Sequence, residues 1–163
     1  MTINTIVIDP NALQRMDTVK KTNDHESINL LAEFNSCIEA NDFLINTDVD
    51  LIFLEIDMPK ISGFEFLDIM NASNITSPEI IITSKNKDHA FRSYSYGVID
   101  YLAKPLDQEL FDKSINKAAF SSYIRYGYVP DPLCILKDTF KLKAGSIIKF
   151  QNNRITEEFK YWD

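Results

Sequence analysis

Residues 50–65 read DLIFLEIDMPKISGFE, and this stretch decides the fold class. Four apolar residues, Leu51–Leu54, lead into two carboxylates, Glu55 and Asp57, and a Met-Pro pair and a glycine-containing turn follow. A run that is apolar at every position is typical of a strand covered on both of its faces. The stretch therefore predicts a central strand of a parallel sheet, with acidic side chains where that strand ends.

Similar short, β-branched runs recur along the chain and alternate with segments of helical periodicity. The predicted strands are Ile3–Ile8, Ile28–Phe34, Leu51–Glu55, Glu79–Thr83 and Ile99–Ala103, and the predicted helices lie near 10–22, 36–46, 63–72, 87–96 and 107–124. Gly97 is expected to end the fourth helix, and Asp107 is expected to be the N-cap of the fifth. Strict alternation predicts an α/β fold whose parallel sheet carries helices on both faces and its working site at the carboxyl ends of the strands.

Composition and charge exclude several classes of protein. The 163 residues carry a net charge of −7. Residues 125–163 hold seven Lys/Arg and five Asp/Glu, or +2, which leaves −9 on residues 1–124 and argues against nucleic-acid binding there. No apolar stretch approaches the ~18 residues that span a membrane, and no signal peptide is indicated. Two distant cysteines, Cys37 and Cys134, suit a reduced, cytoplasmic chain.

The pattern changes after about residue 121. A Pro-Asp-Pro linker precedes three short β-like pieces, Cys134–Lys137, Phe140–Lys143 and Ile147–Phe150. About thirty residues cannot build a large core alone. We therefore expect a main domain over 1–124 and, over 125–163, a linker with a short β-rich tail.

Polar residues gather where the predicted strands end. They are Asp9, Glu55, Asp57, Ser84 and Lys104. Carboxylate oxygens bind hard divalent cations, while Lys and Ser neutralise and hydrogen-bond phosphate oxygens. This edge of the sheet is therefore suited to a divalent cation together with a phosphoryl group.

Several segments carry a resemblance to a known family. The sequence resembles the receiver domain of bacterial two-component response regulators, of the kind that precedes LytTR-type DNA-binding domains, over residues 3 to about 122. The segments that agree in order and spacing are IVIDPNAL, DLIFLEIDMPKISGFEF, the serine of IIITSK, and YGVIDYLAKP. The resemblance implies a flavodoxin-like (βα)5 fold with sheet order 2-1-3-4-5.

The resemblance also implies departures at the acceptor and at the metal site. In the family the phosphate-accepting Asp lies three residues before the Met of the Met-Pro pair, and that position is Glu55 here. Asp57 stands where the family uses a backbone carbonyl to bind magnesium. The acidic pair that ends the first strand is Ile8 and Asp9. The implied metal set of Asp9, Glu55 and Asp57 therefore predicts a weak or absent Mg²⁺ site.

Other site residues match the family pattern. Ser84 and Lys104 fall on the phosphate-sensing positions, Tyr101 falls on the switch aromatic, and the Lys104–Pro105 bond is expected to be cis. A longer carboxylate at Glu55 could project toward Ser84 and Lys104 and form a charge-assisted contact. It would mimic a phosphoryl group only in part, with about one negative charge against ~1.5–2.

These features favour a signal-transduction receiver and not an enzyme. The receiver is expected to be fixed in one state or controlled by partner binding. The expected partner is a sensor kinase or another signalling protein, and a homodimer could form through the fourth helix, fifth strand and fifth helix. The alternative within the class is a working phosphorelay receiver that uses Asp57. A remote alternative is a small doubly wound hydrolase or nucleotide-binding enzyme. Only fold analogy supports it, because the sequence contains no GxxxxGK[ST] motif, no GxGxxG motif and no Ser-His-Asp set.

Further expectations concern histidines, aromatics and the tail. His25 and His89 have no ligand-spaced neighbours and are expected to be isolated and exposed. The aromatics of the fourth helix, Phe91, Tyr94 and Tyr96, are expected to pack, although a partner surface there is the alternative. The tail resembles the opening of a LytTR domain only faintly, and we expect no DNA binding by this chain.

Overall fold

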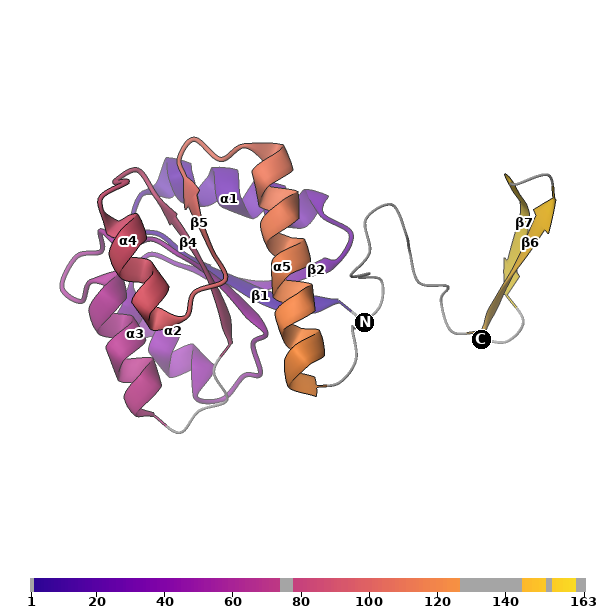
Figure 1. Ribbon diagram of the computed structural model, residues 1–163. Helices are drawn as coiled ribbons and strands as arrows, with labels where there is room; N and C mark the ends of the chain where they lie inside the picture. The colour runs from indigo at the N-terminus through magenta and orange to yellow at the C-terminus, as the bar shows by residue number, and fades with distance from the viewer. Residues whose placement is uncertain (1, 74–77, 127–144, 152–153, 161–163) are drawn as a thin grey trace.

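Five strands form one parallel sheet in the order β2-β1-β3-β4-β5. The strands are β1 Ile3–Ile8, β2 Ile28–Phe34, β3 Leu51–Leu54, β4 Glu79–Ser84 and β5 Asp100–Ala103. This computed structural model describes residues 2–73, 78–126, 145–151 and 154–160 (Figure 1). The predicted fold class and strand order are confirmed.

Helices cover both faces of this sheet. They are α1 Ala12–Asp24, α2 Cys37–Leu44, α3 Gly63–Ala72, α4 His89–Ser93 with the 3-10 turn η1 Tyr94–Tyr96, and α5 Gln108–Tyr126. α1 and α5 lie on one face, and α2, α3 and α4 lie on the other (Figure 1). Each strand is followed by a helix, as the right-handed crossover of parallel strands requires.

Alternation along β3 divides the core into two layers. Ile52 and Leu54 join the cluster under α2 and α3, whereas Leu51 and Phe53 join the cluster under α5. Phe53 stacks on Phe111 of α5 with 5.0 Å between the ring centroids. Burial of one such side chain contributes about 1.5–3 kcal/mol, so the fully apolar strand anchors both layers.

Local signals set most of the element boundaries. The Asp107 side chain accepts the Leu110 N–H, as the predicted N-cap of the fifth helix, and Gly97 adopts φ 69° after η1. β3 ends at Leu54, one residue earlier than predicted, so Glu55 lies just beyond the strand. The predicted fourth helix over 87–96 is wrong in part, because only His89–Ser93 is α-helical and η1 follows.

A separate two-stranded sheet lies in the tail. β6 Ser146–Gln151 contains the predicted piece Ile147–Phe150 and pairs antiparallel with β7 Arg154–Lys160, which the sequence pattern did not predict. The other predicted pieces, Cys134–Lys137 and Phe140–Lys143, lie outside the described residues. Within the described part of the chain, no helix is both long and apolar enough to span a membrane.

Candidate functional site

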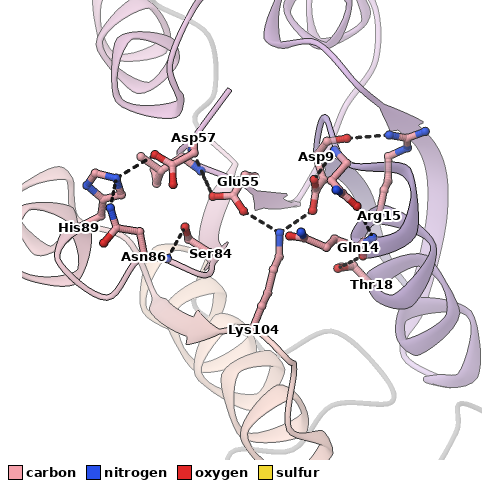
Figure 2. Close-up of polar contacts among 12 residues, drawn as sticks. Asp9, Gln14, Arg15, Thr18, Glu55, Asp57, Ser84, Asn86, His89 and Lys104 are labelled. Atoms are coloured by element: carbon pink, nitrogen blue, oxygen red, sulfur yellow. Dashed lines mark hydrogen bonds and ion pairs between the residues drawn. The ribbon is translucent and has the colours of Figure 1, made fainter. Parts of the chain in front are cut away.

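Three charged side chains meet at the carboxyl edge of the sheet. Lys104, which follows β5, donates from Nζ to Asp9 Oδ2 at 2.5 Å and to Glu55 Oε2 at 2.8 Å (Figure 2). The side chains of Lys104, Asp9 and Glu55 are only 4%, 1% and 6% exposed. The order of the strands brings these residues together although they lie far apart in the sequence. One buried ammonium therefore serves two buried carboxylates.

The second oxygen of Glu55 turns back to the backbone. Glu55 Oε1 accepts the N–H of Ile56 at 2.7 Å and the N–H of Asp57 at 3.2 Å. The carboxylate thus accepts from two amides and one ammonium, which are donors that suit any compact anion. The predicted contact between Glu55 and Lys104 is confirmed.

Ser84 takes a different partner from the one expected. It is fully buried, and its Oγ accepts the N–H of Asn86 at 3.3 Å. The hydrogen bonds to the Glu55 carboxylate come from Lys104 and from the backbone, and the expected approach of Glu55 to Ser84 stays a prediction. Ser84 instead belongs to the turn that leaves β4.

Backbone contacts hold Asp9 in place. Its Oδ1 accepts the Asn11 N–H at 2.8 Å, and its carbonyl accepts from Arg15 Nη1 at 2.7 Å. Arg15 also pairs with Glu33 at 3.0 Å, which joins α1 to β2 at this edge. Arg15 could not be predicted from the sequence, because its contact is with a backbone carbonyl six residues earlier and leaves no motif.

Tyr101 points its hydroxyl toward the loop after β4. The O–H donates to the carbonyl of Asn86, and burial raises the pKa of the phenol. The ring packs against the core cluster under α2 and α3. The position suits the switch role implied for Tyr101, and that role stays a prediction.

The Asp57 carboxylate points away from the buried cluster. It is 59% exposed, and its Oδ1 lies 3.0 Å from His89 Nε2 (Figure 2). The expectation that His89 is isolated and exposed is therefore wrong, since its side chain is only 27% exposed and contacts both Asp57 and Asn86. Asp57 and His89 are 32 positions apart in the sequence, so their contact could not be predicted from local spacing.

His25, Phe91 of α4 and Tyr94 of η1 differ from what the sequence predicts. His25 is half-buried, its Nδ1 accepts the Ser27 N–H, and burial lowers the pKa of its imidazole. Tyr96 packs on Phe64 with 5.3 Å between the ring centroids, as expected. Phe91 and Tyr94 do not pack, because they are 91% and 65% exposed.

The acids that converge here do not fit a preformed magnesium site. Asp9 and Glu55 share one ammonium, the Asp57 carboxylate faces His89, and Ile8 is a fully buried aliphatic side chain. In the described residues, no three His, Cys, Asp or Glu side chains form a cluster that could hold a metal ion. Mg²⁺ requires oxygen ligands in near-octahedral geometry. Weak binding of Mg²⁺ stays a prediction.

Comparison with protein families identifies the fold described above. The family model of the response regulator receiver domain matches residues 5–116. The chain belongs to this family. Its members are signalling regulators, and the receiver fold expected from the sequence is the one observed.

Individual relatives extend the comparison. An uncharacterised response regulatory protein from Yersinia pestis is 28% identical over 115 residues, which are 71% of this chain and 48% of that protein. The transcriptional regulatory protein BtsR of Escherichia coli (strain K12) is 24% identical over 115 residues, 71% of this chain and 47% of BtsR. This receiver chain thus spans about half the length of both relatives.

A solved structure has the same fold. The response regulatory domain of protein MrkE from Klebsiella pneumoniae superposes with a TM-score of 0.67 at 20% sequence identity. The match covers 76% of this chain and 99% of that domain.

Proposed function

We propose that this receiver domain signals without phosphorylation at the acceptor position, because the Glu55 carboxylate already occupies the donors there. The observation that carries the proposal is the set of bonds from Lys104 Nζ and from the N–H groups of Ile56 and Asp57 to that carboxylate. Both oxygens of Glu55 are engaged. A carboxylate held in this way is poorly placed for in-line attack on a phosphoryl donor, and positioning dominates phosphoryl transfer.

The metal side of the reaction supports the same proposal. Phosphoryl transfer relies on a divalent cation that neutralises the charge developing in the transition state. Ile8 is fully buried where the family has an acid, and Asp9 is engaged by Lys104. The Mg²⁺ affinity is therefore expected to be low, which removes a second requirement for ordinary phosphorylation.

The loop after β4 supports a domain held in one arrangement. The Tyr101 hydroxyl is bonded to the Asn86 carbonyl while Glu55 fills the acceptor position. We infer that binding of a partner, and not phosphate, changes the signalling state. The partner would be a sensor kinase or another signalling protein in the cytoplasm.

The exposed aromatics of α4 and η1 support a contact surface. Phe91 of α4 is 91% exposed and Tyr94 of η1 is 65% exposed. We infer that this face joins two copies of the chain. Sedimentation of the wild-type chain should show a dimer, and a Phe91→Ser/Tyr94→Ser variant should be monomeric. A monomeric wild-type chain would exclude the dimer.

The tail supports a longer architecture. The chain spans about half the length of the relatives above, and β6 and β7 form a hairpin after the receiver domain. An isolated hairpin is marginally stable in water, so further strands are expected to cover it in a complete LytTR-type domain. The receiver domain itself, with a net charge of −9 over residues 1–124, is not expected to bind DNA.

One alternative has a specific observation in its favour. Asp57 is 59% exposed just beyond β3, so a phosphoryl donor could reach its carboxylate. Its Oδ1, however, is engaged by His89 at 3.0 Å. The alternative is a receiver phosphorylated on Asp57, and the same experiment tests both.

Acetyl phosphate with Mg²⁺, followed by intact-protein mass spectrometry, separates these functions. The wild-type chain should form no stoichiometric adduct. The Ile8→Asp/Glu55→Asp variant should form one, because it restores the acid pair and the length of the acceptor. A wild-type adduct that Asp57→Asn abolishes would favour the alternative, and one that Glu55→Gln abolishes would overturn the proposal.

A further inference from the structure

His89 faces two partners through a single ring nitrogen. Its Nε2 lies 3.0 Å from Asp57 Oδ1 and 3.1 Å from Asn86 Nδ2 (Figure 2). Asp57 belongs to the loop after β3, and Asn86 belongs to the loop after β4. His89, at the start of α4, therefore joins two loops that flank the buried cluster.

The two partners make opposite demands on that nitrogen. Asn86 Oδ1 accepts the Asp88 N–H at 3.0 Å, which leaves the Asn86 amide nitrogen facing the ring as a donor. The ionised Asp57 carboxylate can only accept. An imidazole nitrogen carries either a proton or a lone pair. Nε2 can therefore form a good hydrogen bond with only one of the two at a time.

Packing against Phe64 holds the His89 ring near both Asp57 and Asn86. His89 lies edge-on against Phe64, with 5.6 Å between centroids and an interplanar angle of 83°. The Arg92 guanidinium lies 4.2 Å from the centroid of the same Phe64 ring, and the His89 side chain is only 27% exposed. This packing restrains rotation of the His89 ring. The proton can still move from one ring nitrogen to the other.

We propose that His89 is a positioning residue that selects between Asp57 and Asn86, and that a cationic group of a partner reverses the selection. In the free chain the charge-assisted bond to Asp57 prevails, since such bonds are roughly twice as strong as neutral ones. When a partner's guanidinium or ammonium binds the Asp57 carboxylate, the proton moves to Nδ1 and Nε2 accepts from Asn86. This inference rests on the proposed function, in which partner binding controls the domain.

Asn86 connects His89 to Ser84 and Tyr101. The Asn86 N–H donates to Ser84 Oγ, and its carbonyl accepts from Tyr101. A new bond from the Asn86 side chain to His89 would therefore restrain the residue that holds Tyr101 inward. The Asp57 carboxylate is 59% exposed, and residues 1–124 carry a net charge of −9, so a basic partner surface is complementary.

The tautomer of His89 tests the proposal directly. Nitrogen NMR of the full chain with ¹⁵N-labelled histidine would be recorded at about pH 8.5, above the range of about pH 5–8 where histidine charge usually changes. The wild-type signal should show Nε2 protonated. Asp57→Ala should move the proton to Nδ1, and Asn86→Ala should leave it on Nε2. His89→Gln assigns the signal, since His25 is the other histidine.

Matched variants make each outcome decisive. Asp48→Ala removes an exposed carboxylate at the other end of the sheet and should leave the tautomer of His89 unchanged. A wild-type signal with Nδ1 protonated, or an unchanged tautomer in Asp57→Ala, would overturn the selection. If Asp57→Ala fails to fold, a change of tautomer in Asn86→Ala would overturn it as well. An acetyl phosphate adduct would end the proposed function and would leave these tautomer results standing.

Discussion

Replacing Lys104 by methionine tests the buried cluster at the carboxyl edge of the sheet. The ammonium lies between Asp9 and Glu55, and the three side chains are 4%, 1% and 6% exposed. Methionine keeps the length of the side chain and removes its charge, so two buried carboxylates lose their counter-ion. Removal of one partner from a buried pair costs about 3–5 kcal/mol, and two pairs break here, so we expect the upper end of that range.

The expected loss is a large part of the total. Domains unfold with free energies of about 5–15 kcal/mol. Urea titration followed by circular dichroism would measure the change, and at about 1–3 kcal/mol per molar urea the midpoint should fall by roughly 2 M.

Two further variants show whether the charges act as a unit. Glu55→Gln keeps the shape of the side chain and leaves Asp9 and Lys104 as a neutral pair, so it should cost less, about 1.5–3 kcal/mol. The Lys104→Met/Glu55→Gln variant should lose less than the sum of the two single changes, because the second carboxylate charge is gone.

A surface pair provides the control. Lys113 pairs with Glu109 where the side chains are 59% and 78% exposed, so Lys113→Met should leave the unfolding free energy unchanged. If Lys104→Met proves as stable as Lys113→Met, or if the double variant is additive, the cluster is not coupled and the reasoning about Glu55 fails.

Three other residues give independent predictions. Gly63→Ala should cost about 1–3 kcal/mol in urea unfolding, because a Cβ there would lie 2.7 Å from the Glu55 carbonyl oxygen. Lys60→Gly should stabilise by up to about 1 kcal/mol, because Lys60 adopts φ 69°. His25 should weaken the fold as pH falls below its ordinary pKa of 6.5: burial lowers the pKa, so the unfolded chain binds the proton first. His25→Gln should remove that part of the slope between pH 5 and pH 8.

Each of these predictions has a contrary result. An unchanged midpoint for Gly63→Ala would mean that the turn after β3 relaxes freely. A less stable Lys60→Gly would show that the loop is not strained at that residue. Identical pH profiles for the wild-type chain and His25→Gln would exclude His25 as a source of acid sensitivity.

The fold could be predicted from the sequence because its signals are local. The apolar run at Leu51–Leu54 and the alternation of strands and helices specify a doubly wound sheet, and Asp107 and Gly97 act at helix ends as expected. The length of the fourth helix could not be predicted, since 3-10 turns are frequent at the ends of α-helices and the residue pattern does not show where one begins. β7 was missed because its charged sequence, RITEEFK, gives a weak strand pattern.

The candidate site was predicted unevenly. Asp9, Glu55 and Lys104 could be placed from the ends of the predicted strands, and the bond from Lys104 to Glu55 could be expected from the length of the glutamate side chain. The bond from Lys104 to Asp9 was not predicted. The bonds that Glu55 accepts from the N–H groups of Ile56 and Asp57 depend on its side-chain rotamer. The contact of His89 with Asp57 depends on how two loops pack. Neither depends on sequence spacing, so neither could be predicted.

The backbone bonds of Glu55 have a consequence for what this domain can sense. A carboxylate covalently joined to the site that it fills is always present at a very high effective concentration, whereas a phosphoryl group arrives only when a donor supplies it. Under the proposed function, occupancy of the site would not follow the concentration of a phosphoryl donor. The strength of the signal would instead be set by how many copies of the chain are made and how many meet a partner, so transcription and turnover become its control points.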